Sequence, residues 1–191
     1  MTVRAQYVLA CLFLIIATPA WAATVTAISC SRADVATAIT ASSDGDTVTI
    51  PAGTCSWTTN LPVTKGITLK GAGSGSTILQ DDVDRTSGGG AFLDFTVAVG
   101  KSWRVTAVGF SPGALTTRST AIITVAGTST LWRIDNCAFN NAYADRGIYL
   151  TGGATYGVVD HNTATYRTQF LVVKHTNWGG GANNYGDGSW A

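Results

Sequence analysis

The stretch Leu131-Trp132-Arg133-Ile134-Asp135-Asn136-Cys137-Ala138-Phe139-Asn140-Asn141 decides the fold, because similar patterns lie on both sides of it. It has the form of a short strand that bends at Asp-Asn and then continues inward. The related stretches are Trp103–Phe110 upstream and Gly157–Ala164 downstream. Aligning Val105, Ile134 and Val159 gives spacings of 29 and 25 residues. A motif that returns at such spacings is typical of a solenoid.

A second motif advances almost in step with the first. It consists of strand-like runs at Ala91–Phe95, Ala121–Val125, Arg146–Leu150 and Gln169–Val173. Their central residues are 30, 25 and 23 residues apart. Each repeat therefore contains at least two strands, and the drifting period indicates outer loops of unequal length. We expect like residues to stack inside as the columns Leu93/Ile123/Ile148/Leu171, Phe95/Val125/Leu150/Val173 and Val105/Ile134/Val159.

The composition favours one domain built of short strands. The chain has 191 residues, with 22 Gly and only 4 Pro, and 46% of its residues are hydrophobic. Charged residues make up 12%, about half the usual share. The net charge of +1 gives no electrostatic footprint for nucleic acid.

The first 23 residues have the pattern of a secretory signal peptide. An apolar core from Val8 to Ala17 precedes Ala20-Trp21-Ala22, which has the small-x-small form of a cleavage site. We expect cleavage after Ala22 or Ala23 and an extracellular or periplasmic protein. The alternative is a membrane anchor, for which the apolar run is too short, and no later stretch is expected to span a membrane.

The cysteines fit an oxidising compartment. Cys30 and Cys55 flank one helix-strand unit, and we expect them to form a disulfide at the amino-terminal end. Cys137 lies at an inward position and is expected to be a buried free thiol. Metal binding by cysteine is not expected, because the chain contains no C-x-x-C spacing.

One helix is expected, from Ser31 to Ala41. Ser31 and Asp34 have the spacing of a capping box, and Val35, Ala38 and Ile39 share one helical face. Since an open solenoid end exposes apolar rungs, this helix is the candidate for a terminal cap.

Three segments near the amino terminus carry a resemblance to a known family. Asp34–Ile39, Gly45–Thr54 (Gly-Asp-Thr-Val-Thr-Ile-Pro-Ala-Gly-Thr) and Ile67–Gly73 (Ile-Thr-Leu-Lys-Gly-Ala-Gly) resemble the opening of pectin-lyase-like proteins. The resemblance implies an all-β, right-handed parallel β-helix over residues 24–191. The repeats of this chain predict about five to six coils. The structural alternative is an antiparallel sandwich. In such a sandwich, two different motifs would not return along the chain at nearly the same spacing.

The carboxyl-terminal stretch Asn177–Ala191 is rich in Gly and Asn, and no pattern after Phe170–Lys174 predicts a capping element. We therefore expect the chain to be the amino-terminal part of a longer protein, which would be a monomer at full length.

Two aspartates are the main candidates for chemistry. Asp135 and Asp160 align one coil apart, roughly 4.8 Å, and such a pair could bind calcium or share a proton. Asp160-His161 also resembles the Asp-His rung of pectate lyases. The structural alternative is that Asp135, Asn136, Asp160 and Asn162 are turn residues that hydrogen-bond the backbone.

Further candidates lie beside this pair. The catalytic candidates are Asp160, His161, Arg167 and Lys174. Arg104 and Arg133 align as an outward basic pair, with surface solvation as the alternative. Trp103 and Trp132 align and could stack on sugar rings, with core packing as the alternative. Asp81-Asp82 is interpreted as a solvated loop pair.

The resemblance implies a secreted protein that acts on acidic polysaccharides. Pectate lyases eliminate across the C4–C5 bond of a uronate with the help of calcium and an arginine. Their R-x-P-x-x-R run is missing here, as is an aspartate-rich rung after Asp160-His161. The hypothesis of a lyase therefore stands beside that of a non-catalytic, adhesin-like β-helix that binds carbohydrate or a cell surface.

Overall fold

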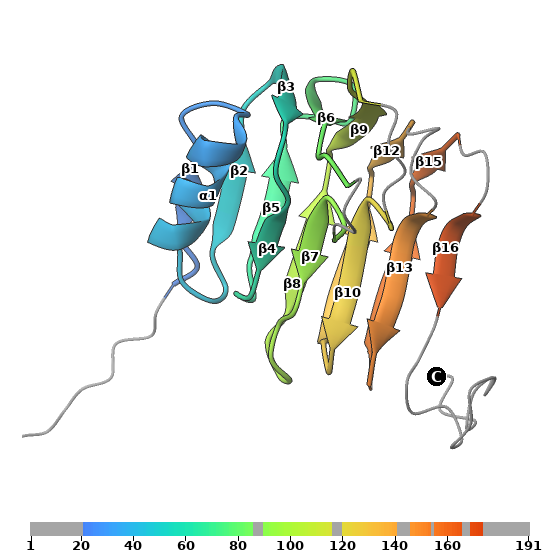
Figure 1. Cartoon of the computed structure of the whole chain (residues 1–191). Helices are drawn as coiled ribbons and strands as arrows, with labels where there is room; N and C mark the ends of the chain where they lie inside the picture. The colour runs from blue at the N-terminus through green and yellow to red at the C-terminus, as the bar shows by residue number, and fades with distance from the viewer. Residues whose placement is uncertain are drawn as a thin grey trace, which may run out of the picture.

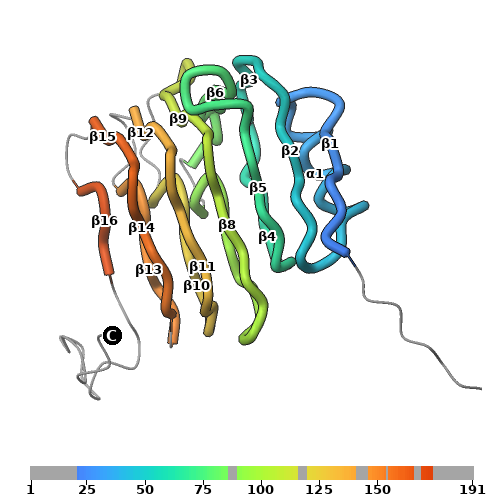
Figure 2. The backbone as a smooth tube through the Cα atoms, turned by 180° about the vertical axis from the view of Figure 1, so that it is seen from behind, coloured from blue at the N-terminus to red at the C-terminus, as the bar shows by residue number. Residues whose placement is uncertain are grey.

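The computed structural model describes residues 21–85, 90–115, 120–140, 146–153, 155–165 and 169–173. The chain passes through three parallel sheets, A, B and C, in the same order in five successive coils (Figures 1 and 2). The predicted parallel β-helix is therefore confirmed. Every strand pair is parallel, which excludes the antiparallel sandwich.

Each sheet runs the length of the solenoid. Sheet A contains β1 (Thr24–Thr26), β2 (Thr47–Ile50), β5 (Thr68–Gly71), β8 (Trp103–Thr106), β11 (Thr130–Asp135) and β14 (Tyr156–Asp160). Sheet B contains β3 (Gly53–Trp57), β6 (Thr77–Asp81), β9 (Gly109–Pro112), β12 (Ala138–Phe139) and β15 (Thr163–Ala164). Sheet C contains β4 (Leu61–Val63), β7 (Leu93–Phe95), β10 (Ile123–Gly127), β13 (Arg146–Gly152) and β16 (Gln169–Val173).

The register between coils confirms the three expected columns. Ile123 pairs with Leu93 on one side and Ile148 on the other, and Ile148 pairs with Leu171. Ile134 pairs with Val105 and Val159 in the same way. The columns arise because alternate side chains of a strand point to opposite faces, so like residues in register bury one another.

Aromatic rings in stacked and edge-to-face contact fill the core beside these aliphatic columns. Neighbouring rings in the main column are 4.9 to 6.2 Å apart between centroids. Its members are Trp57, Phe92, Phe110, Phe139 and Phe170. Burial of each large apolar side chain contributes roughly 1.5–3 kcal/mol, so successive coils stabilise one another.

Helix α1 (Arg32–Ala41) covers the amino-terminal end, as expected. The Ser31 hydroxyl caps it by accepting a hydrogen bond from the Asp34 amide at 3.2 Å. Val35, Ala38 and Ile39 are buried, and the helix contacts β1 to β4.

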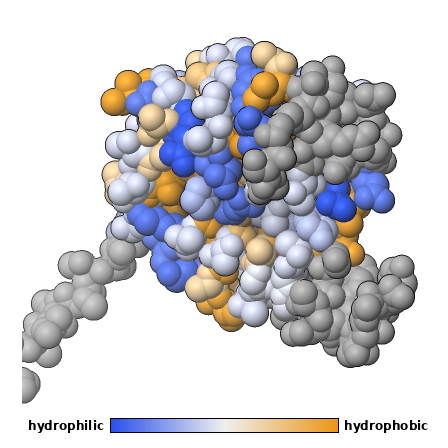
Figure 3. All heavy atoms as spheres, in the orientation of Figure 1, coloured by the Kyte–Doolittle hydropathy of each residue, from blue (hydrophilic) through white to orange (hydrophobic). Residues whose placement is uncertain are grey.

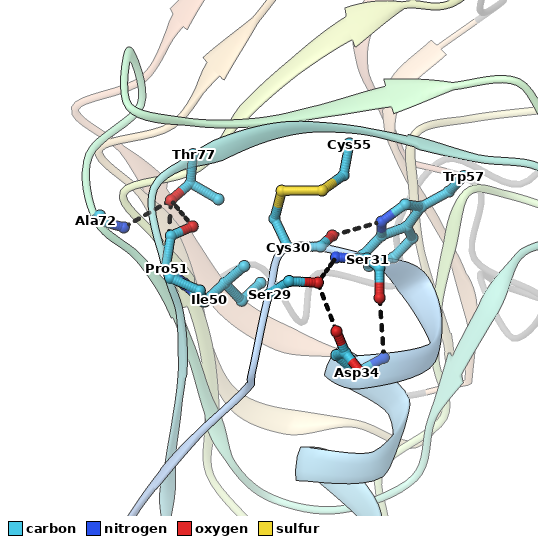
Figure 4. Close-up of a disulfide and its surroundings, with 10 residues drawn as sticks. All are labelled: Ser29, Cys30, Ser31, Asp34, Ile50, Pro51, Cys55, Trp57, Ala72 and Thr77. Carbon is cyan, nitrogen blue, oxygen red and sulfur yellow. Dashed lines mark hydrogen bonds between the residues drawn. A yellow bond between two sulfur atoms is a disulfide. The ribbon is translucent and has the colours of Figure 1, made fainter.

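A disulfide between Cys30 and Cys55 joins the residue before the helix cap to strand β3 (Figure 4). The Trp57 indole N–H donates to the Cys30 carbonyl at 2.9 Å and fixes the same segment. This confirms the predicted pairing. Cys137 is a buried free thiol, also as expected, and burial raises its pKa to about 12.

The last coil is less covered than the others. Leu171 continues a core column, yet it is 43% exposed because no described element packs over β16.

On the face drawn in Figure 3, hydrophilic and hydrophobic residues are interspersed among the coloured atoms. Among the described residues, α1 is the only helix, and it is too short and too polar to span a membrane. The expected signal peptide falls almost wholly on residues 1–20, outside the described part of the chain.

Candidate functional site

The outer face of sheet A carries two columns of polar side chains. They alternate along each strand with core residues such as Val48, Leu69 and Val105, so they point away from the core. One column is Thr24, Thr47, Thr68, Arg104 and Arg133, and it ends at the apolar Val158. The other is Thr26, Thr49, Lys70, Thr106, Asp135 and Asp160. Hydroxyl groups therefore dominate one end of this face, and charged groups dominate the other.

Two hollows lie on this face and share part of their lining. The larger, of about 530 Å³, is lined by Thr24, Thr47, Thr49, Thr68, Lys70, Arg104 and Thr106. The other, of about 330 Å³, is lined by Gly45, Gly66, Thr68, Ser102, Trp103, Arg104 and Arg133. Because Thr68 and Arg104 line both, the two hollows adjoin, and together they extend from β1 to β11. We call the two together the sheet A groove.

Arginine and aspartate side chains join successive coils at the charged end of this face. Arg104 donates through Nε and Nη2 to the two carboxylate oxygens of Asp135, with Nε–Oδ1 at 2.7 Å. Arg133 binds Asp160 in the same way, with Nε–Oδ1 at 2.9 Å and Nη2–Oδ2 at 2.6 Å. In both pairs the aspartate lies one coil further and two residues along from its arginine. We call these two pairs the arginine–aspartate ladder.

The ladder fixes the charge of its members. The Arg104 guanidinium holds the pKa of Asp135 below its ordinary value, although the carboxylate is fully covered. Arg133, with help from His161, lowers the pKa of Asp160 to about 2. Both carboxylates are therefore ionised at neutral pH. The paired carboxylates in turn raise the pKa of both arginines.

The bend after each sheet A strand explains the neighbouring polar residues. Ala107, Asn136 and His161 occupy the same place in three coils and have φ between 52° and 60°. The Asn162 side chain accepts from the Cys137 amide at 2.9 Å and donates to the Ile134 carbonyl at 2.8 Å. Asn136 also lies at the bend, but its side chain donates to Asp135 Oδ2 at 2.6 Å and not to the backbone. The turn interpretation thus describes Asn162. It does not describe Asp135 and Asp160, whose carboxylates pair with arginines.

His161 contacts Asp160 at the same bend. Its Nδ1 lies 2.7 Å from Asp160 Oδ2, and its side chain is 72% exposed. The structure thus brings Asp160, His161 and Arg133 together. Arg167 and Lys174, the other catalytic candidates, lie outside the described residues.

Of the two interpretations of the aligned tryptophans, the structure shows core packing and not a platform for sugar rings. Trp103 and Trp132 are 2% and 3% exposed, and their rings stack on each other at 5.5 Å. Trp103 also stacks on Phe95 at 4.0 Å. Their ring faces are thus occupied by the core, because residues next to the outward arginines must point inward.

Calcium at Asp135 and Asp160 stays a prediction, and the geometry gives it little room. Their register confirms that they are neighbours one coil apart. Their oxygens, however, already accept from arginines. In the described part of the chain, no three His, Cys, Asp or Glu side chains gather as a metal site.

Asp81 is not the solvated loop residue that the sequence suggested. It is the last residue of β6, is 7% exposed and pairs with the buried Arg85 at 2.8 Å. Burial raises the pKa of Asp81 despite this cation. Asp82 is bound by the Ser56 hydroxyl and the Leu115 amide.

The groove and the pairing within the ladder were not predicted from the sequence. A signal for the groove was present, since Thr24-Val25-Thr26, Thr47-Val48-Thr49 and Thr68-Leu69-Lys70 repeat a polar–apolar–polar pattern. Arg104-Val105-Thr106 and Arg133-Ile134-Asp135 continue it with charged residues.

Comparisons of the chain with models of protein families, with curated proteins and with solved structures found no match. The parallel β-helix therefore rests on the structure itself, and the likeness to pectin-lyase-like proteins remains a resemblance of sequence patterns.

Proposed function

We propose that this protein is a secreted β-helix that binds acidic polysaccharide along the outer face of sheet A. The observation that carries the proposal is the sheet A groove, which crosses five strands and is lined by hydroxyl and cationic side chains. Adjacent strands are roughly 4.8 Å apart, which is close to the length of one sugar residue in an extended glycan. A chain lying along the solenoid axis would therefore meet similar groups at each step.

Charge favours an acidic over a neutral glycan. Asp135 and Asp160 balance the charges of Arg104 and Arg133, and Lys70 adds a further cation on the same face. Thr47, Thr68 and similar residues offer hydroxyl groups to the sugar hydroxyls. The free energy would then come from many modest hydrogen bonds and one net positive charge, which suits a binding module.

Secretion belongs to the same proposal. It is supported by the signal-like pattern of the first 23 residues and by the disulfide, which forms in oxidising compartments.

The test measures binding of the full chain to polygalacturonate and alginate by isothermal titration calorimetry, with neutral dextran as the comparison. We expect the acidic polymers to bind and added salt to weaken this binding. Lys70→Gln should reduce the affinity several-fold. Arg32→Gln is the control, because it also removes one positive charge but lies on α1, where Arg32 bonds the Asn60 carbonyl. Equal binding of dextran and the acidic polymers, or none at all, would reject the proposal.

The contact between Asp160 and His161 favours a second candidate, a lyase. His161 would remove the C5 proton of a uronate while Arg133 neutralises its carboxylate. The C5–H electrons would form the C4–C5 double bond as the C4–O bond breaks. The departing oxygen would take a proton from water, and the protonated imidazole would later return its proton to solvent. Asp160 would orient the imidazole.

An absorbance assay for the unsaturated uronate product distinguishes the two functions. The lyase requires product from polygalacturonate or alginate, and it requires that His161→Ala abolish that product while binding persists. If the unaltered protein binds the polymers but forms no product, the lyase is rejected and the binding function remains.

A further inference from the structure

The two arginines of the ladder keep hydrogen-bond donors that no described residue uses. A guanidinium has five N–H donors. Arg104 and Arg133 each spend one Nε–H and one Nη2–H on an aspartate. The remaining donors include both hydrogens of Nη1, at the other end of the planar group, and no further partner among the described residues binds them.

The side chains that carry these donors line the sheet A groove. The two side chains are 39% and 44% exposed, and both line the hollow of about 330 Å³. The residues are register partners on β8 and β11, so their backbones are roughly 4.8 Å apart. Two equivalent donor groups thus repeat along the axis at the spacing of the coils.

We propose that Arg104 and Arg133 form a double carboxylate subsite, which holds two consecutive uronic acid residues of a glycan lying along the solenoid axis. Asp135 and Asp160 are positioning residues, which hold each guanidinium by one edge and leave the opposite end for the ligand. The inference rests on the proposed function and assigns its acidic specificity to these two arginines.

Preorganisation is the physical reason why a paired arginine would bind a uronate carboxylate more tightly than a free one. A free arginine side chain loses rotamer freedom when it binds a ligand, and a chain already fixed by a carboxylate loses less. The planar guanidinium also matches a carboxylate in a way that a lysine ammonium cannot. The aspartates cancel most of the long-range attraction, so the subsite selects by geometry at short range.

The alternative is that the ladder only ties the coils together and that net charge alone attracts the glycan. Replacing Asp160 separates the two, because the change has opposite consequences in each case. Asp160→Asn removes a negative charge beside the groove, so attraction by net charge would strengthen binding. It also loosens Arg133, because the asparagine amide can accept only one of the two hydrogen bonds and the remaining contact, Nε to Asp135 Oδ2, is 3.7 Å long. A preorganised subsite would therefore bind more weakly.

The experiment titrates mono-, di- and trigalacturonate into the full chain and its variants. Observing the Arg Nε–H signals by NMR gives both affinity and location. For the unaltered protein we expect digalacturonate to bind roughly ten-fold more tightly than the monomer, because a second charge-assisted hydrogen bond is added. The signals of both arginines should shift. Arg133→Lys keeps the charge and should lower digalacturonate affinity roughly ten-fold, Asp160→Asn should lower it several-fold, and Arg32→Gln should leave it unchanged.

The outcomes separate this inference from the proposed function. Absence of polygalacturonate binding in the unaltered protein overturns both. Binding that survives Arg133→Lys unchanged, or that strengthens in Asp160→Asn, overturns the subsite and leaves the groove as a binding face. Asp160 is partly exposed, at 26% of its side chain, so Asp160→Asn should fold. An unchanged far-UV circular dichroism spectrum checks that it does. If Asp160→Asn does not fold, the affinity of Arg133→Lys for digalacturonate decides whether the subsite exists.

Discussion

At the scale of single residues, Asp160 shows how neighbouring side chains shift the pKa of a carboxylate. Two partners, Arg133 and His161, lower its pKa from an ordinary 3.8 to about 2. The folded pKa lies below the unfolded one, so the ion pair contributes its full stability above about pH 4. That contribution is lost as the pH falls toward 2.

We predict that carbon-detected NMR will find the Asp160 carboxyl titrating near pH 2 in the folded protein. In Arg133→Gln, the pKa should rise toward its ordinary value, because the largest cause of the shift is gone. Lys101→Gln, which removes a cation paired with Asp44 instead, should leave Asp160 unchanged. An Asp160 pKa near 3.8 in the unaltered protein would show that the pair does not form in solution.

At the scale of elements, the packing of β14 on β11 depends on a glycine. Gly157 pairs with Trp132, and a Cβ at this position would lie 2.0 Å from the indole ring. Since Trp132 is also stacked on Trp103, the ring has little freedom to move. A larger residue at 157 would therefore push the two coils apart.

We predict that Gly157→Ala will lower the free energy of unfolding by about 1–3 kcal/mol, the usual cost of overpacking. Urea denaturation measures it. Gly75→Ala is the matched control, since a Cβ there meets no atom within 4 Å, and it should stay close to the unaltered protein. Equal stability of the two variants would mean that the coils at β11 and β14 adjust without cost.

At the scale of the whole molecule, the disulfide connects the capping helix to the first full coil. The closed segment between Cys30 and Cys55 spans 25 positions, a length for which loop closure contributes about 3.5 kcal/mol. Because α1 covers the apolar amino-terminal end, losing this tie should destabilise the solenoid from that end.

We predict that replacing both Cys30 and Cys55 by Ala will lower the free energy of unfolding by about 2–4 kcal/mol. A reducing agent should lower the stability of the unaltered protein by a similar amount and leave the double variant unchanged. The denaturation midpoint with and without reductant is the measurement, and an unaltered protein insensitive to reductant would contradict the prediction.

The sequence by itself determined the architecture of the coils. Hydrophobic residues that alternate along a strand and return every 23 to 30 residues have few ways to be buried together. Aligning Val105, Ile134 and Val159 was therefore enough to predict which residues stack. The capping helix and the disulfide followed from local signals of the same kind, a cap at Ser31 and two cysteines around one unit.

Only the tertiary structure decided which side chains on neighbouring coils bind each other. Alignment placed Asp135 beside Asp160 and Arg104 beside Arg133, but each arginine reaches diagonally to an aspartate on the next coil. Such a contact depends on side-chain length and rotamer, which a register does not specify. The burial of Trp103 and Asp81 likewise depends on what packs against them from distant segments. The site therefore depended on three-dimensional packing, whereas the fold followed from periodicity.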